Sequence, residues 1–435
     1  MKKWLFAFVA SLWIFCGSAS AEESNLIELP SEEYRFTDVP SDKIWRIQLS
    51  TFVKEEEVRI HLRDAEGQSI ETLIGIAKGK VITVNPPEGG YDLGSNYTLE
   101  IPRSSGLSTL FSKYLELDIK IHFSTEPLPL SEQVQVRVNQ LQTKWNELRP
   151  VNDGEDATGY SLEVPYKQGR ATDRALQDAL NVTNFVRYTA GLNDNITLNE
   201  TYNEAAQAAS LVNYLNSGLS HSPTQPAGLD KSIYDLGFLG ASKSNLGMGY
   251  SSLADSVINV RNGYLGDSDD SNISRVGHRR WVLSPALNQI GFGYIPGNKT
   301  WSSTAMYVIE GNKKAPNYGE ILWPVETAMP LQLFNEDHPW SISFDPMEYS
   351  AQNIGELVVK LTKNNETITL TDNNTKHFYV DRGNYGDQKQ VLIFRPDDMQ
   401  PIKAGDHFTV EVSGLYTANN SPTTFTYETT FFRLK

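Results

Sequence analysis

Hydrophobic and polar residues alternate through much of the first third of the chain. Leu115, Leu117, Ile119, Ile121 and Phe123 fall on one face of an extended segment, and the residues between them are polar. Shorter alternations occupy 58–62 and 97–101. A period of two is typical of a strand with one buried face. The pattern therefore predicts a small β-sandwich over residues 22–125.

Short apolar segments typical of β-strands return at the end of the chain. Apolar-rich segments at 358–361, 391–394 and 408–412 are separated by turn residues such as Gly405-Asp406. We expect a second β-sandwich over residues 337–435.

Helical spacing dominates the middle of the chain. Apolar residues recur every three or four positions in 130–148, which predicts a helix within a linker at 126–175. A second helix is expected around 176–187. Asn199 precedes a third, whose stripe of alanines at 205, 208 and 209 would let a neighbouring element approach closely, and Gly218 is expected to end that helix.

The first 21 residues are typical of a secretory signal peptide. Lys2 and Lys3 precede an apolar run at 4–15, and Ala19-Ser20-Ala21 offers a small-residue cleavage site. The run is shorter than the roughly 20 residues a membrane span needs, which disfavours a membrane anchor. A lipid-modified Cys16 is disfavoured by the bulky Phe15 before it. We expect a secreted, extracellular or cell-wall-associated protein.

Charge and cysteine content narrow the function classes. Cleavage after Ala21 would remove Cys16, the only cysteine, so the mature chain would form no disulfide, as suits a Gram-positive exterior. The formal net charge is −15, and losing Lys2 and Lys3 makes it −17 (−15 − 2). Such acidity argues against nucleic acid and anionic lipid as partners. No other segment is long and apolar enough to span a membrane.

The candidate chemistry lies with two of the seven histidines. His221 sits in Leu219-Ser220-His221-Ser222-Pro223, and His278 opens Gly277-His278-Arg279-Arg280-Trp281. Both segments are loop-like and lie within the helical part of the chain. Loops held by a rigid scaffold commonly carry binding groups.

Several motifs around these histidines occur in a familiar order. They are Asn184-Phe185-Val186-Arg187, the alanine-rich 205–215, 219–222, Ser244-Asn245-Leu246, Tyr264-Leu265-Gly266-Asp267, Gly277-His278-Arg279 and Gly291-Phe292-Gly293. With this order and spacing, residues 176–309 resemble a domain of the CAP superfamily (cysteine-rich secretory proteins, antigen 5, pathogenesis-related 1), in its bacterial SCP-like branch. The flanking β segments resemble Ig-like modules.

The resemblance implies an α+β fold. It has a central CAP-type α-β-α sandwich at 176–312, a connector at 313–336, and two flanking Ig-like β-sandwich domains. It also implies a cleft built around His221 and His278. Family members typically add two acidic residues, but Ser244 replaces the first and Asp267 is the candidate for the second. Asn245 would tie loops together through its amide.

Three interpretations of the histidine pair remain open. The two histidines and Asp267 could together bind a divalent metal such as zinc, which takes three protein ligands and a water in catalytic sites. The acidic loop at 267–272 could hold calcium, although it lacks the glycine of an EF-hand loop. The cleft could otherwise work without a metal, or the histidines could be structural. No cofactor is required by the sequence.

Ser244 is a poor candidate for a nucleophile, because no Gly-x-Ser-x-Gly turn surrounds it. Arg187 and Trp281 are expected to be buried structural residues. We therefore predict a non-catalytic binding protein whose cleft takes a small or lipid-like ligand or a cell-wall component. The alternatives are a metal-assisted hydrolase acting on peptide or cell-wall material, and a purely adhesive surface protein.

Overall fold

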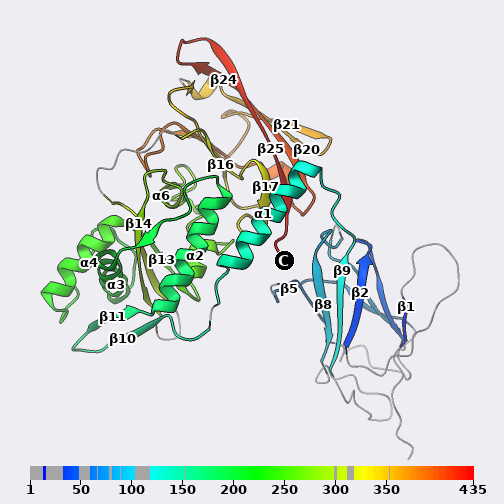
Figure 1. The fold of residues 1–435 in the computed structure, drawn as a ribbon, viewed down its shortest axis with the longest axis horizontal. Helices are drawn as coiled ribbons and strands as arrows, with labels where there is room; N and C mark the ends of the chain where they lie inside the picture. The colour runs from blue at the N-terminus through cyan, green and yellow to red at the C-terminus, as the bar shows by residue number, and fades with distance from the viewer. Residues whose placement is uncertain are drawn as a thin grey trace, which may run out of the picture. The chain divides into compact units, whose positions relative to one another are not determined.

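A computed structural model describes residues 13–15, 33–48, 59–65, 67–77, 81–88, 90–102, 118–151, 153–297, 301–310, 318–351 and 353–435. Contacts divide the chain into two compact units, Met1–Pro129 with Lys435, and Leu130–Leu434 (Figure 1). The finer domain boundaries expected from the sequence stay predictions.

The first unit is a sandwich of two sheets. One sheet has the order β2 (Glu33–Val39), β9 (Ile119–Thr125), β8 (Asn96–Ile101), β4 (His61–Arg63) and β5 (Ser69–Ile70). The other has the order β1 (Trp13–Phe15), β3 (Trp45–Gln48), β7 (Val81–Val84) and β6 (Ile74–Ala77). Residues of both sheets share one core, in which the ring of Trp45 lies 4.8 Å from that of Phe123. The alternating segments at 97–101 and 119–123 are strands, as predicted.

The predicted signal peptide falls mostly outside the described residues, as does Cys16. Of its 21 residues only Trp13–Phe15 are described, as strand β1 paired antiparallel with β3. Signal-peptide function stays a prediction.

The second unit begins with helix α1 (Glu132–Leu148) and the hairpin of β10 (Ala157–Ser161) and β11 (Lys167–Ala171). Helices α2 (Asp173–Thr189), α3 (Glu200–Leu215) and α4 (Lys231–Lys243) follow. The side chains of Ser131, Thr172, Asn199 and Asp230 each accept a hydrogen bond from a backbone N–H of the first turn, which explains where these helices start.

The end of α3 differs from the prediction. Ser217, not Gly218, adopts the left-handed conformation, with φ of 54°. The Ser217 N–H donates to Tyr214 O at 3.0 Å and the Gly218 N–H donates to Asn213 O at 3.3 Å. This is the Schellman pattern, and it places the glycine one residue beyond the left-handed position.

One sheet packs against helices α2, α3 and α4, in the order β12 (Thr197–Leu198), β14 (Gln289–Ile295), β15 (Ser303–Tyr307) and β13 (Ser244–Met248). Helix α3 crosses it so closely that side-chain atoms at Gly291 and Gly293 would overlap the α3 backbone. Side chains of α3 also bond to the sheet, since the Phe292 N–H donates to Asn203 Oδ1 at 3.0 Å. Two short helices, α5 (Leu253–Ile258) and α6 (Gly277–Val282), lie in the segment between β13 and β14.

The rest of this unit is mainly strands, with short 3-10 helices at Ile354–Glu356 and Asp397–Met399. One sheet has the order β16 (Ile321–Trp323), β18 (Trp340–Ser343), β23 (Val391–Phe394) and β22 (Phe378–Asp381). The other has β17 (Thr327–Pro330), β25 (Pro422–Phe432), β24 (His407–Thr417), β20 (Val358–Lys363) and β21 (Glu366–Leu370), with β19 (Tyr349–Ser350) on β24. Trp340 packs against Phe394 of its own sheet and Phe408 of the other, so one aromatic core joins the two sheets.

The predicted fold class, an α+β chain built on a central CAP-type α-β-α sandwich between two β-sandwiches, is wrong. The described residues form 25 strands in six sheets but six α-helices, two of which have six residues each. Small sheets dominate, and the architecture is nearer to β-sandwich folds than to an α-β-α core. The resemblance rested on short motifs, which report the local backbone but not the layers around it.

No helix among the described residues is long and apolar enough to cross a membrane.

Candidate functional site

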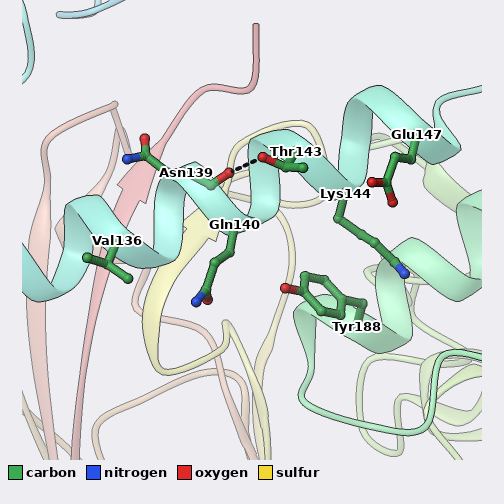
Figure 2. A pocket seen from close by; sticks show the side chains of 7 residues that line it. All are labelled: Val136, Asn139, Gln140, Thr143, Lys144, Glu147 and Tyr188. Atoms are coloured by element: carbon green, nitrogen blue, oxygen red, sulfur yellow. Dashed lines mark hydrogen bonds between the residues drawn. The ribbon is translucent and has the colours of Figure 1, made fainter.

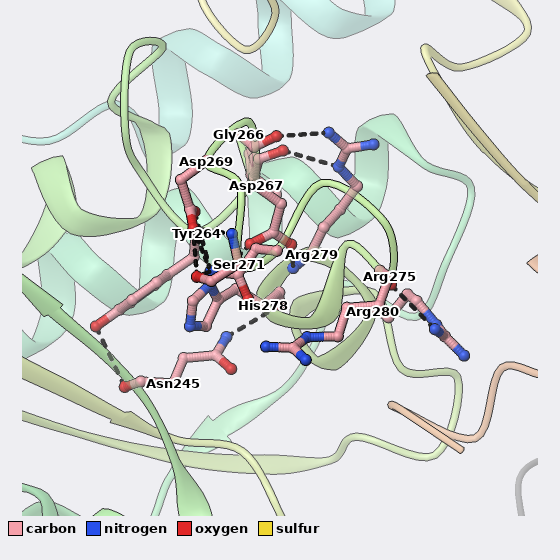
Figure 3. Close-up of polar contacts among 12 residues, drawn as sticks. Asn245, Tyr264, Gly266, Asp267, Asp269, Ser271, Arg275, His278, Arg279 and Arg280 are labelled. Atoms are coloured by element: carbon pink, nitrogen blue, oxygen red, sulfur yellow. Dashed lines mark hydrogen bonds and ion pairs between the residues drawn. The ribbon is translucent and has the colours of Figure 1, made fainter. Parts of the chain in front are cut away.

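His278 is held in place by Asp267. The His278 Nδ1 atom lies 2.7 Å from Asp267 Oδ1, and the second carboxylate oxygen accepts a hydrogen bond from the Arg279 N–H at 3.0 Å (Figure 3). The Asp267 side chain has 0% exposure, whereas the His278 side chain retains 24%. Because a carboxylate only accepts hydrogen bonds, Nδ1 carries the proton in this pair. Asp267 therefore fixes both the tautomer and the orientation of the ring.

The surroundings of His278 act on its charge in opposite directions. Burial favours the neutral ring and by itself lowers the pKa, but the charge of Asp267 and its hydrogen bond outweigh burial, with a further contribution from Asp269. The net effect is a raised pKa for His278. The Nε2 atom has no hydrogen-bond partner within the described part of the chain, so the ring offers one open nitrogen.

Asn245 and Tyr264 complete the surroundings of the ring. The Asn245 side-chain amide donates to the backbone carbonyl of His278 at 3.0 Å, which connects β13 to α6. The hydroxyl of the buried Tyr264 bonds to Asn245 O at 3.3 Å and to Thr304 Oγ1 at 2.9 Å. Its ring lies 5.6 Å from the His278 ring, centroid to centroid. These contacts bring three of the predicted residues, Asn245, Asp267 and His278, together in one network.

Ser244 and His221 stand outside this network. Ser244 is 3% exposed, and its hydroxyl has no hydrogen-bond partner in the described chain, so no base activates it. His221 is exposed, and its Nδ1 atom lies 2.8 Å from the carbonyl oxygen of Ala241 in α4. Within the described residues, no hydrogen bond, ion pair or ring contact joins His221 to His278. The hydrogen-bonded network therefore includes His278 but not His221, and a cleft shared by the two histidines stays a prediction.

The described residues contain no group of three or more His, Cys, Asp or Glu side chains placed to hold a metal ion. Asp267 already uses one oxygen on His278 and the other on a backbone N–H. In the acidic loop, Asp269 accepts hydrogen bonds from Ser271 and Asn272, so that carboxylate closes its own turn. No chemical step is therefore assigned to a metal.

Three buried arginines surround this part of the chain. Arg187 has 0% exposure, as predicted for a structural residue, and donates to the carbonyls of Asn193, Val282 and Ser284. Trp281 is only half-buried, short of the core position expected for it. Arg279 and Arg280 were given no specific partner by sequence reasoning. Both follow His278 directly in the sequence, and this position was the one local sign that they help to hold the site.

A shallow hollow of about 510 Å³ lies elsewhere, on α1 and Tyr188 (Figure 2). The Tyr188 ring takes part in cation–π contacts with Arg137 at 5.0 Å and Lys144 at 5.2 Å. Arg137 also donates to the Tyr188 carbonyl at the end of α2. These contacts explain the hollow as part of the packing of α1 on α2, and it includes none of the predicted site residues.

Comparison with known proteins assigns no family. No protein-family model and no curated protein matches the chain. Among solved structures, CopC from Methylosinus trichosporium OB3b is 14% identical with a TM-score of 0.18, covering 23% of this chain and 91% of that one. The mixed-linkage glucan utilization locus protein SGBP-B of Bacteroides ovatus, in complex with a mixed-linkage heptasaccharide, is 9% identical with a TM-score of 0.13, covering 99% and 70%. Both TM-scores are too low to show a shared fold.

Proposed function

We propose that this chain is a secreted, non-catalytic binding protein that holds a cell-wall component at His278. One observation carries the proposal: a buried carboxylate fixes the imidazole through Nδ1 while Nε2 stays open and the ring partly exposed. The predicted signal peptide and the acidic, single-cysteine composition support an extracellular setting.

The chemistry of the open nitrogen favours binding over catalysis. With Nδ1–H committed to Asp267, Nε2 accepts a hydrogen bond when the ring is neutral and donates one when the ring is protonated, which the raised pKa favours. Both modes suit the hydroxyl groups of cell-wall polymers, and the protonated form also suits their carbonyl and carboxylate oxygens. The two acids near it, Asp267 and Asp269, both have their carboxylate oxygens engaged in hydrogen bonds, and the buried Ser244 has no base beside it in the described residues. The metal-assisted hydrolase alternative has no comparable support.

The test uses the variant His278→Asn. The asparagine amide can replace Nδ1–H as donor to Asp267, which keeps the buried carboxylate paired while the ring and its Nε2 atom are lost. His407→Asn is the matched control, because His407 is an exposed histidine of the same unit, with 43% side-chain exposure. The measurement is co-sedimentation of each purified mature protein with purified Gram-positive cell walls.

We expect the wild type and His407→Asn to sediment with the walls and His278→Asn to lose at least roughly tenfold in affinity, the range of one charge-assisted hydrogen bond. Equal retention of all three proteins would contradict a site at His278 and favour a purely adhesive role.

A further inference from the structure

We infer that Arg279 is a positioning residue through which the C-terminal strands fix the Asp267 loop and hence the His278 ring. The inference rests on the proposed function for its importance to ligand binding, but its geometry stands by itself. Arg279 is 1% exposed, and all of its side-chain hydrogen bonds go to two places. One is the loop before Asp267 and the other is the start of β18.

The first set of bonds holds the loop. Arg279 Nε donates to Leu265 O at 2.8 Å and Nη2 donates to Gly266 O at 3.0 Å, as Figure 3 shows for the guanidinium. These carbonyls belong to the two residues before Asp267, which itself has φ of 47°. Such a left-handed conformation is unfavourable for a residue other than glycine and persists only where the surroundings impose it. The Arg279 N–H adds a bond to the Asp267 carboxylate, so one residue holds both the backbone and the side chain.

The second set of bonds anchors the guanidinium in the C-terminal strands. Arg279 Nη1 donates to Pro339 O at 2.7 Å and to Ser341 Oγ at 3.1 Å. Ser341 lies in β18 next to Trp340, which belongs to the aromatic core between the two sheets. The planar fork of arginine can satisfy all of these acceptors at once, which a lysine ammonium cannot do.

A neighbouring histidine fastens the same loop from the same strand region. His338 has 0% exposure, and its Nε2 atom lies 2.7 Å from Val260 O. A carbonyl only accepts, so Nε2 carries the proton. A Cβ on Gly266 would come within 3.2 Å of that nitrogen, which indicates how tightly the loop is packed. Residues 338–341 therefore hold the loop at Val260 and, through Arg279, at Leu265 and Gly266.

Arg279 carries a charge that is costly to bury. Burial lowers the pKa of Arg279 to about 9, and Asp267 only partly offsets this. The guanidinium bonds only to carbonyls and a hydroxyl, so no opposite charge in the described chain bonds to it directly to offset the free-energy cost of burying it. Arg187 is a matched comparison, because it is equally buried and also bonds to carbonyls, but not to those of the Asp267 loop.

The test compares Arg279→Lys with Arg187→Lys in the full mature chain. The readout is the hydrogen-bonded Nδ1–H resonance of His278 in protein labelled with ¹⁵N-histidine, assigned by its absence in His278→Asn. We expect Arg279→Lys to lose this resonance, or to speed its exchange with water at least about tenfold, and to weaken co-sedimentation with Gram-positive cell walls. Arg187→Lys should lower the melting temperature yet keep the resonance.

Ser341→Ala provides a milder second variant if Arg279→Lys does not fold, since it removes one anchor of the guanidinium. It should accelerate exchange of the same proton. An unchanged resonance in whichever of these two variants folds would overturn the positioning role. The resonance requires no ligand, so a wild type that fails to bind walls while Arg279→Lys loses the resonance would refute the proposed function and leave the inference standing.

Discussion

At the scale of single residues, burial together with neighbouring charges shifts the pKa values of two histidines in opposite directions. His278 keeps a raised pKa because Asp267 outweighs burial, whereas the buried His338 faces Arg279 rather than an acid. Burial, and secondarily the charge of Arg279, lowers the pKa of His338 to about 3, while its bond to Val260 O offsets only part of this. His338 is therefore neutral in the folded protein at ordinary pH.

This pKa makes stability fall in acid. Below the ordinary value of 6.5 the unfolded chain takes up a proton at His338 that the folded chain refuses until about pH 3. Stability supplied by this group is thus full above 6.5 and is lost as pH falls, by about 1.4 kcal/mol per pH unit. Phenylalanine cannot titrate. We therefore expect the free energy of unfolding of His338→Phe to fall by about 1 kcal/mol less than that of the wild type between about pH 7 and about pH 5.5.

Urea unfolding of both proteins at the two pH values measures this difference. The variant will be less stable at both, because it lacks the bond to Val260, so the difference between the pH values is the informative quantity. Parallel losses in the two proteins would show that His338 titrates normally.

The residues of the site were only partly predictable. Asn245, Asp267 and His278 were found because each lies in a short local motif, and the structure links them by hydrogen bonds. The partners of Arg279 lie about 60 residues further along the chain, at Pro339 and Ser341, and no local pattern reports such a contact. The resemblance pairs His221 with His278; the His221 ring bonds to the carbonyl of Ala241, and a cleft shared by the two histidines stays a prediction.

At the scale of elements, small residues set how closely helices approach. The alanine stripe of α3 was predicted to admit a close neighbour, and α4 fills that place with Gly237 and Gly240. A Cβ on Gly240 would overlap the Ala205 carbonyl and touch Ala209. The sequence showed the stripe, but the helix that covers it is a matter of tertiary packing.

We therefore expect Gly240→Ala to destabilise the protein by about 1–3 kcal/mol, the range for overpacking. A loss of stability would point to overpacking, because a glycine-to-alanine change in an unobstructed helix would instead stabilise the protein by roughly 0.5–1 kcal/mol. Urea unfolding measures it, with Gly218→Ala as control, since a Cβ at Gly218 meets nothing within 4 Å. A Gly240→Ala protein as stable as the control would mean that α4 can shift away from α3 at little cost.

At the scale of the whole molecule, local patterns identified some of the 25 strands of the described residues but misjudged the architecture. Alternation found β8, β9 and β20 because it depends only on one buried face, whereas β23 was found as a short apolar run that is buried throughout. The number of layers depends on which faces meet, and this is decided by distant contacts such as Trp340 against Phe408. The α-β-α expectation failed at that level.

The arginine contacts lead to a prediction about truncation. Arg279 and Arg280 both take acceptors from the C-terminal strands: Arg280 donates to Gln388 O at 2.7 Å and also contacts Asp381 and Gly383. Removing residues 337–435 would take these acceptors away from both guanidinium groups and would delete the aromatic core around Trp340. We expect a chain ending at residue 336 not to fold cooperatively.

The matched deletion removes the other unit. A chain beginning at Leu130 keeps every one of these contacts, because Leu130–Leu434 forms one compact unit, and we expect it to unfold in a single thermal transition with the His278 Nδ1–H resonance intact. Calorimetry and the same ¹⁵N-histidine spectrum compare the two truncations. If the chain ending at 336 unfolds cooperatively and keeps the resonance, the C-terminal strands do not support the site. If the chain from Leu130 loses the resonance, the support must include residues of Met1–Pro129.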